Sequence, residues 1–255
     1  MGKVGSTAVT HGLRESSLGR PVVHVHQLNP DHLGRVDRWA RARYSHSGTI
    51  SPVALDAMYL GPRLAEMMKH RKLDIVTMVR DPIGRNLSGF FQSLAATHPD
   101  LAARLAGDPA EACLAEAREL FRRTRLGEDP WSWFDEELRA LTGLDLFAHE
   151  FDPERGWAIY ENDRCRVLLV RFSDLSAVFA RAANEFLGVA DVELPRRNEA
   201  SSRATAAAHA RLQADLGLTV EEVEAVYDDD RMRHWYTDDE IGSLVEKWSK
   251  PVTAG

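Results

Sequence analysis

The segment at the start of the chain combines residue types that bind phosphate or sulfate. It reads Gly2-Lys3-Val4-Gly5-Ser6-Thr7, and we predict a helix directly after it. Two glycines let backbone N–H groups face inward, a helix start adds unpaired donors and a positive dipole end, and Lys3 adds a mobile cation. A Walker A loop would instead need Gly-Lys-Ser/Thr, whose hydroxyl binds magnesium. We therefore expect an anion site whose ligand need not carry magnesium; a flexible terminus is the alternative interpretation.

A second set of anion-binding residues follows a predicted buried strand at residues 74–79. Arg80 stands at the carboxyl end of that strand, where open α/β sheets bind their ligands. Asp81-Pro82 is a helix-start signal, and Arg85 and Ser88 share a face of the helix that follows. An ordinary strand–helix junction with a surface arginine pair is the alternative. Two anion sites at successive strand ends predict one ligand with two separated phosphates.

These motifs are similar to those of sulfotransferases over most of the chain. Gly2–Thr7 resembles their 5′-phosphosulfate loop, and Arg80–Phe90 resembles their 3′-phosphate motif. Residues 167–175 resemble a later Arg-Tyr-Glu-Asp-Leu segment, with Ser173 in place of the glutamate. Residues 198–203 resemble the late loop that closes over the nucleotide. The resemblance implies a sulfuryl donor, 3′-phosphoadenosine 5′-phosphosulfate (PAPS), a product, adenosine 3′,5′-bisphosphate, and no metal.

Three further segments resemble the sulfotransferase-like bacterial capsular polysaccharide synthesis proteins: His24-Val-His26, residues 133–138 and residues 235–241. The implied activity is sulfuryl transfer from PAPS to a hydroxyl or amine of a carbohydrate or another small acceptor. The alternatives are a P-loop nucleotide kinase or NTPase with a variant loop, and a non-catalytic nucleotide-binding protein. The nucleotide-binding residues that the resemblance implies are Gly2, Lys3, Val4, Gly5, Ser6, Thr7, Arg80, Ser88, Asn198, Ser202 and Arg203.

Two kinds of side chain are expected to carry the chemistry. Lys3 faces the charge that develops on the leaving 5′-phosphate, where a cation stabilises the transition state. An acceptor hydroxyl needs a base, and histidine is the usual choice near neutral pH. His24 and His26 alternate along a predicted strand at residues 21–26, so we expect His26, nearer the strand end, as the base and His24 as the second candidate. His46 is a third and weaker candidate. For His24 and His26 the alternatives are a structural role and a metal site.

Helices and strands alternate along the chain, which favours an α/β layer fold. Strands are expected at residues 21–26, 74–79, 157–160 and 166–171, with helices at residues 6–18, 32–43, 52–69, 82–94, 109–124, 131–141 and 174–187 and through most of the C-terminal part. The expected class is a three-layer P-loop-type fold, with a central, mostly parallel sheet flanked by helices, in a single domain over residues 1–255. A phosphate loop normally follows a central strand. We expect that strand to be missing ahead of Gly2, which would leave an exposed apolar slot in the sheet.

Composition limits the partners. The 255 residues carry a formal net charge of −7, which argues against a general nucleic-acid coat. The two cysteines exclude a disulfide scaffold and fit a reducing compartment. No apolar run is long enough for a membrane span and no signal peptide is recognisable. We therefore expect a cytoplasmic enzyme whose partners are a nucleotide donor and a small-molecule or saccharide acceptor, without nucleic acid or a membrane span.

Overall fold

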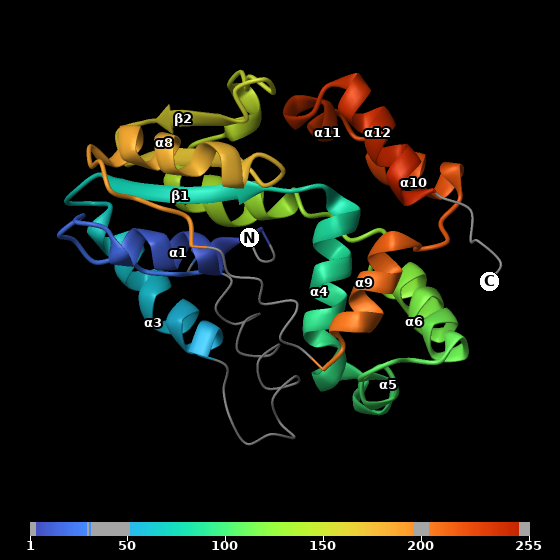
Figure 1. Ribbon diagram of the computed structural model, residues 1–255. Coiled ribbons are helices and arrows are strands. Elements are labelled where there is room, and N and C mark those ends of the chain that lie inside the picture. The colour runs from blue at the N-terminus through green and yellow to red at the C-terminus, as the bar shows by residue number, and fades with distance from the viewer. Residues whose placement is uncertain (1–3, 30, 32–51, 196–203, 250–255) are drawn as a thin grey trace. The chain divides into compact units, whose positions relative to one another are not determined.

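The structure is a computed structural model that describes residues 4–29, 31, 52–195 and 204–249 (Figure 1). The chain divides into two compact units. Unit 1 comprises Met1–Arg80 and Trp131–Arg196, and unit 2 comprises Asp81–Pro130 and Arg197–Gly255. The prediction of a single domain over the whole chain stays a prediction, because a compact unit is a geometric grouping of contacts.

The described strands of unit 1 form one three-stranded sheet in the order β1-β3-β2. β1 (Leu73–Val79) pairs in parallel with β3 (Cys165–Arg171). β2 (Trp157–Glu161) pairs antiparallel with β3, because residues 162–164 are too few for the crossover that a parallel pair requires. This sheet is therefore mixed, whereas we expected a mostly parallel one.

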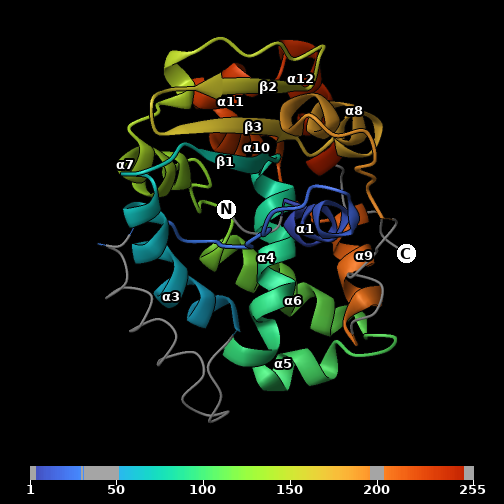
Figure 2. The same cartoon turned by 90° about the vertical axis from the view of Figure 1, so that its left-hand side faces the viewer.

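Helices of unit 1 lie on both sides of this sheet, α8 with α1 on one side and α7 with α3 on the other (Figure 2). The centre of the sheet is fully buried at residues 167–170 of β3. Gly188 has a φ of 70° and ends α8, as its position in the sequence predicts. The helical elements of this unit are α1 (Ser6–Glu15), α3 (Pro52–Met67), the π-helix η2 (Phe134–Arg139), α7 (Ala140–Thr142), the 3₁₀ turn η3 (Leu146–Ala148) and α8 (Leu175–Leu187).

The described part of unit 2 is helical. Its first helix starts where the sequence predicts, because the Asp81 carboxylate accepts hydrogen bonds from the N–H groups of Ile83 and Gly84. The last helix starts with a capping box, in which the side chains of Thr237 and Glu240 each accept a hydrogen bond from the other residue's backbone N–H. These two residues therefore have a structural role at the start of the helix. The helices are α4 (Pro82–Thr97), α5 (Pro99–Arg104), α6 (Glu111–Thr124), α9 (Ala206–Ala214), α10 (Val220–Tyr227), α11 (Asp230–Trp235) and α12 (Asp238–Trp248).

The prediction of a strand at residues 21–26 is wrong. This segment is not part of the described sheet. Side chains instead bind its backbone: Arg14 donates from Nε and Nη2 to the Val22 carbonyl oxygen at 3.2 and 3.1 Å. At the other end, Trp133 Nε1–H donates to the His26 carbonyl oxygen at 2.6 Å. An alternating β-branched pattern predicts a strand, but here the segment makes these contacts outside the described sheet.

The fold class is confirmed at a coarse level: the structure is mixed α/β, with a small sheet and many helices. The finer assignment, a three-layer P-loop-type fold, stays a prediction. None of the described helices is both long enough and apolar enough to cross a membrane.

Candidate functional site

The described part of the predicted phosphate loop, Val4–Thr7, forms the N-terminal end of α1. Gly5 is the N-cap and has a φ of 85°, a left-handed conformation that favours glycine. A Cβ atom on Gly5 would lie 2.8 Å from Leu175 Cδ2 and 3.1 Å from Phe172 Cε2. The glycine therefore also lets the loop pack against the turn that follows β3.

The first turn of α1 has no acidic residue, and no described side chain caps it. The first N–H groups of a helix lack partners within the helix, and they lie at the positive end of its dipole. Ser6 and Thr7, half-buried and exposed respectively, add two hydroxyls to this turn. Such donors can bind an anion, and the anion site expected at this end of α1 stays a prediction.

Phe172 connects this loop with Arg80. The Arg80 guanidinium carbon lies 4.4 Å from the centroid of the Phe172 ring, which is within the range of a cation–π contact. The Phe172 N–H donates to the Val79 carbonyl oxygen at 2.7 Å, so the ring belongs to the carboxyl ends of β1 and β3. The structure thus brings Gly5 and Arg80, which come from two separate motifs, against one aromatic side chain.

An ion pair between a buried arginine and a half-buried aspartate holds the turn that carries Phe172. Arg171 is only 4% exposed; its Nε donates to the Asp174 carboxylate and its Nη2 donates to the Pro153 carbonyl oxygen at 2.9 Å. A Cβ atom at Gly156 would lie 2.7 Å from Asp174 Oδ2, so that glycine leaves room for the carboxylate. The sequence analysis singled out residues 167–175 only for their resemblance to a sulfotransferase segment, and it did not predict that Phe172 would contact Arg80 and the loop at Gly5. An aromatic residue directly after a strand end was its only local signal.

The two candidate base histidines lie together in unit 1. The ring centroids of His24 and His26 are 4.7 Å apart, and the rings meet edge to face. The hydrogen bond from Trp133 fixes the backbone at His26, as described above. The two rings are therefore neighbours, although the strand predicted to align them does not form.

A buried carboxylate fixes the chain just after these histidines. Glu137, in η2, is 6% exposed, and its Oε2 accepts hydrogen bonds from the N–H groups of Leu28 at 2.7 Å and Asn29 at 2.8 Å. The sequence reasoning did not assign a role to Glu137. The sequence feature that could have indicated this role is a glutamate close to two apolar residues, Phe134 and Leu138, both of which are buried in the structure.

The residues predicted downstream of Arg80 belong to unit 2. Ser88 lies on α4 and is 9% exposed. Arg85, predicted to share its face, donates from Nη1 to Asn86 Oδ1 at 2.7 Å and lies 3.5 Å from the Glu128 carboxylate. Burial lowers the pKa of the Arg85 guanidinium below its usual value. Arg85 thus has a structural role within unit 2, and the binding of a 3′-phosphate by Ser88 stays a prediction.

Asp81 has more partners than its role as a helix cap requires. Besides the two N–H groups of α4, its carboxylate accepts the Tyr227 hydroxyl at 2.6 Å and Trp248 Nε1–H at 3.1 Å. Asp81 is 8% exposed, so these four donors stabilise a buried charge. Burial, together with the Asp81 charge, raises the pKa of Tyr227 above its usual value. Neither aromatic partner could be assigned from the sequence, since both lie far along the chain.

Several predicted site residues lie outside the described residues, and their roles stay predictions; they are Gly2, Lys3, His46, Asn198, Ser202 and Arg203. In the described part of the chain, no group of three or more His, Cys, Asp and Glu side chains could hold a metal ion.

A comparison with family models finds one whose description is "Putative capsular polysaccharide synthesis protein", which matches residues 112–237. The predicted resemblance to such proteins is thus confirmed over these residues, which include the segment at residues 133–138 and the first three residues of the segment at residues 235–241. No curated protein and no solved structure matches the chain. The wider resemblance to sulfotransferases stays a prediction.

Proposed function

We propose that this protein is a sulfotransferase that moves a sulfuryl group from PAPS to a hydroxyl or amine of a carbohydrate or another small acceptor. The observation that supports it best is the convergence on Phe172 of the glycine at the start of α1 and the Arg80 guanidinium. Two anion-binding groups at the carboxyl ends of neighbouring parallel strands suit a ligand with two separated phosphates. The match to a polysaccharide synthesis family supports a saccharide acceptor.

In this proposal the loop at residues 2–7 binds the 5′-phosphosulfate. Sulfuryl transfer breaks the bond between sulfur and the 5′-phosphate oxygen while the acceptor oxygen or nitrogen attacks in line. Negative charge then builds on the 5′-phosphate. Lys3 and the N–H groups at the start of α1 would stabilise that charge, so their main effect is on the rate of transfer.

Arg80 would bind the 3′-phosphate, a group that ATP lacks and that does not change during transfer. Its contribution is therefore to binding rather than to turnover. The cation–π contact with Phe172 holds the guanidinium at the strand end. Guanidinium groups bind phosphate oxygens with two parallel hydrogen bonds, which is the role proposed for Arg80. We propose that the described sheet is part of a P-loop-type fold in which this edge binds the nucleotide.

His26, with His24 as the second candidate, would take the proton from an acceptor hydroxyl. The imidazole must be neutral to accept that proton. Trp133 and Glu137 would act as positioning residues, because they bind the backbone at His26 and just after it.

Nucleotide binding gives the first test. We expect adenosine 3′,5′-bisphosphate to bind without magnesium in titration calorimetry. Arg80→Ala should weaken that binding roughly 10- to 150-fold, since a hydrogen bond to a charged group contributes about 1.5–3 kcal/mol. Arg181→Ala, an exposed arginine on α8, is the matched control and should change nothing. Unchanged affinity in the Arg80 variant would contradict the assignment, and a response to magnesium–ATP alone would favour a kinase or NTPase.

Sulfate transfer gives the second test, with labelled PAPS and a panel of saccharides and phenols. Lys3→Ala should lower kcat while leaving the affinity for adenosine 3′,5′-bisphosphate nearly unchanged. His26→Ala should lower kcat by about 10²–10⁴-fold and remove the acid limb of the pH–rate profile. An active His26 variant with an unchanged pH profile rejects His26 as the base; an inactive His24 variant would transfer the role to His24.

A further inference from the structure

Cationic side chains gather in unit 1 where the strands β1 and β3 begin. Leu73 is opposite Cys165 in the parallel ladder, so the basic residues just before β1 and those at the start of β3 lie at the same end of the sheet. Residues 20, 63–74 and 161–166 contain seven Lys and Arg and four Asp and Glu side chains, a formal charge of +3 in a chain of −7. We call this cluster the basic end of the sheet and define it by Arg20, Arg63, Arg71, Lys72, Arg164 and Arg166.

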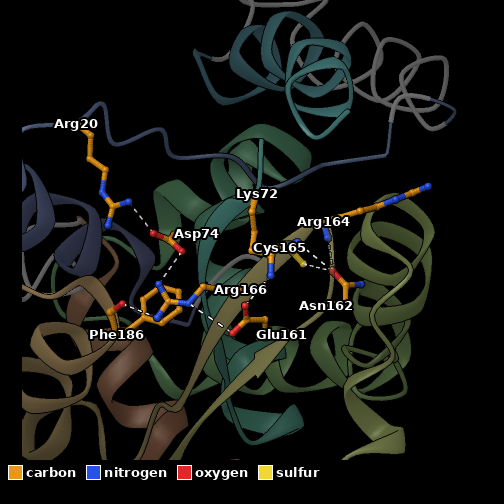
Figure 3. A network of polar contacts seen from close by, with 9 residues as sticks. All are labelled: Arg20, Lys72, Asp74, Glu161, Asn162, Arg164, Cys165, Arg166 and Phe186. Carbon is orange, nitrogen blue, oxygen red and sulfur yellow. Dashed lines mark hydrogen bonds and ion pairs between the residues drawn. The ribbon is translucent and has the colours of Figure 1, made fainter. Parts of the chain in front are cut away.

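Two carboxylates hold three of these cations side by side. Asp74 lies between Arg20, at 2.7 Å, and Arg166, at 3.3 Å (Figure 3). Glu161 accepts a hydrogen bond from Lys72 Nζ at 2.6 Å and lies 3.9 Å from Arg166. Three positive charges therefore share two negative ones, and the side chains of Arg20 and Lys72 remain 47% and 36% exposed. The basic end thus keeps excess positive charge on side chains that ion pairs already hold in place.

Two further arginines of the basic end form no ion pair with a carboxylate in the described part of the chain. Arg71 Nη2 contacts the Met67 sulfur at 3.8 Å, and Arg164 Nη1 donates to the Leu141 carbonyl oxygen at 3.4 Å. Both arginines are exposed, and in Figure 3 the Arg164 side chain extends away from the ion pairs. A guanidinium binds a carboxylate or sulfate group with two parallel hydrogen bonds. These two side chains are therefore suited to anionic groups of a ligand.

The basic end lies at the opposite end of β1 from the candidate site. Arg80 and the loop at Gly5 are at the carboxyl ends of β1 and β3, next to Phe172. From Leu73 to Val79 the strand spans roughly 20 Å, at about 3.3 Å per residue. A ligand that uses both ends must therefore be long, as a polymer chain is, and it must carry negative charges at separate points to match the separate cations.

An anionic polysaccharide fits the basic end better than a membrane or a nucleic acid does. Membranes are bound by groups of exposed apolar side chains, and single-stranded nucleic acid is bound by rows of aromatic rings. In the described part of the chain the exposed large apolar side chains are few, and Tyr59, the aromatic one among them, has the Arg63 guanidinium 5.8 Å from its ring centroid. A polysaccharide needs neither arrangement, and the match to a polysaccharide synthesis family favours it.

We propose that the basic end binds an anionic polysaccharide chain and that this chain is the acceptor of the sulfuryl group. Its role as acceptor rests on the proposed function, whereas binding at the basic end stands on the side chains named above. Carboxylate or sulfate groups on the sugars pair with Arg71 and Arg164. A chain bound there brings its hydroxyl groups to the other end of β1 at a high effective concentration.

The first test measures binding without nucleotide. The probe is an oligogalacturonate, which carries a carboxylate on each sugar, and an uncharged dextran oligosaccharide of equal length is its control. We expect only the oligogalacturonate to bind, with an affinity that falls as salt rises. Arg71→Gln/Arg164→Gln should weaken this binding about tenfold or more. Arg123→Gln/Arg181→Gln, which removes the same charge at exposed arginines elsewhere, should change it less than about twofold.

The second test adds PAPS, with the oligogalacturonate as acceptor. The variant at Arg71 and Arg164 should raise KM for this acceptor about tenfold with little change in kcat, because binding at the basic end does not alter the transfer step. Its affinity for adenosine 3′,5′-bisphosphate and its thermal midpoint should equal those of the parent protein. The single variant Arg71→Gln, with a smaller effect in the same direction, replaces the pair if the double substitution unfolds the chain.

The outcomes separate this inference from the proposed function. No binding of the oligogalacturonate, or equal affinities in the two double variants, would overturn the binding role of the basic end, whether or not the protein binds the nucleotide. Binding with no transfer to any acceptor would overturn the acceptor role and the proposed function together, and would keep the binding surface. Tighter binding of phosphatidylserine vesicles or single-stranded DNA, lost in the variant at Arg71 and Arg164, would assign the basic end to a membrane or a nucleic acid instead.

Discussion

Replacing Glu137 should show how strongly one carboxylate holds the segment that carries the candidate base. Both N–H groups that it binds donate to the same oxygen, Oε2. In Glu137→Ala these two donors, the buried N–H of Leu28 and the half-buried N–H of Asn29, lose their acceptor, and each unpaired buried group costs about 1–3 kcal/mol. The expected loss is therefore about 2–5 kcal/mol. In Glu137→Gln the amide oxygen can take the place of Oε2 and keep both bonds, so only the charge assistance is lost, about 1 kcal/mol.

Urea unfolding, followed by tryptophan fluorescence and far-ultraviolet circular dichroism, measures these differences. Glu224→Ala, an exposed glutamate on α10, is the control and should stay within about 0.5 kcal/mol of the parent protein. The reasoning is refuted if Glu137→Ala costs no more than this control, or if the glutamine variant is as unstable as the alanine variant. The second outcome would mean that charge, rather than the acceptor geometry at Oε2, carries the stabilisation.

Three other perturbations follow from single contacts. Tyr227→Phe removes one donor to the buried Asp81 carboxylate and should cost about 1.5–3 kcal/mol in urea unfolding; a stability equal to that of the parent would contradict the contact. The hydrogen bond from Arg231 lowers the pKa of Asp229 in the folded state, so its contribution, up to about 1 kcal/mol, is present above the usual aspartate pKa of about 4 and is lost as the pH falls through the lowered value. The stability gap between the parent and Asp229→Asn should accordingly be open at pH 6 and shrink below pH 4; a gap that does not change with pH would argue against the pair. Gly5→Ala adds a Cβ atom 2.8 Å from a leucine methyl at a φ of 85°, and should lower the thermal midpoint and weaken adenosine 3′,5′-bisphosphate binding together. A variant that binds the nucleotide as the parent does would show that the loop tolerates the change.

Local signals determined most of the elements. Asp81-Pro82 starts α4 because the carboxylate accepts the first free N–H groups of the helix, and Gly188 ends α8 because it can adopt a left-handed conformation. These are interactions between residues a few positions apart, so the sequence contains all of their partners. The same holds for the apolar strands β1 and β3, whose composition alone predicted them.

Contacts between residues far apart in the chain could not be predicted from local sequence signals. The segment at residues 21–26 has the pattern of a strand, yet Trp133 binds its backbone and no described strand pairs with it. Likewise β2 joins the sheet antiparallel because of a short connection to β3. Whether such a segment joins a sheet depends on which other parts of the chain pack against it in the folded protein. The alternation of residue types along the segment does not specify those neighbours.

The same distinction between local signals and long-range contacts applies to the candidate site. The residue types at Gly5 and Arg80 suggested anion binding, with structural alternatives left open, because a helix start after a glycine and a guanidinium after a strand can both bind anions. Only the tertiary structure could place both of them against Phe172 and assign Glu137 to the backbone after the histidines. These contacts join residues far apart in the chain, and only the folded arrangement of strands and helices brings them within bonding distance.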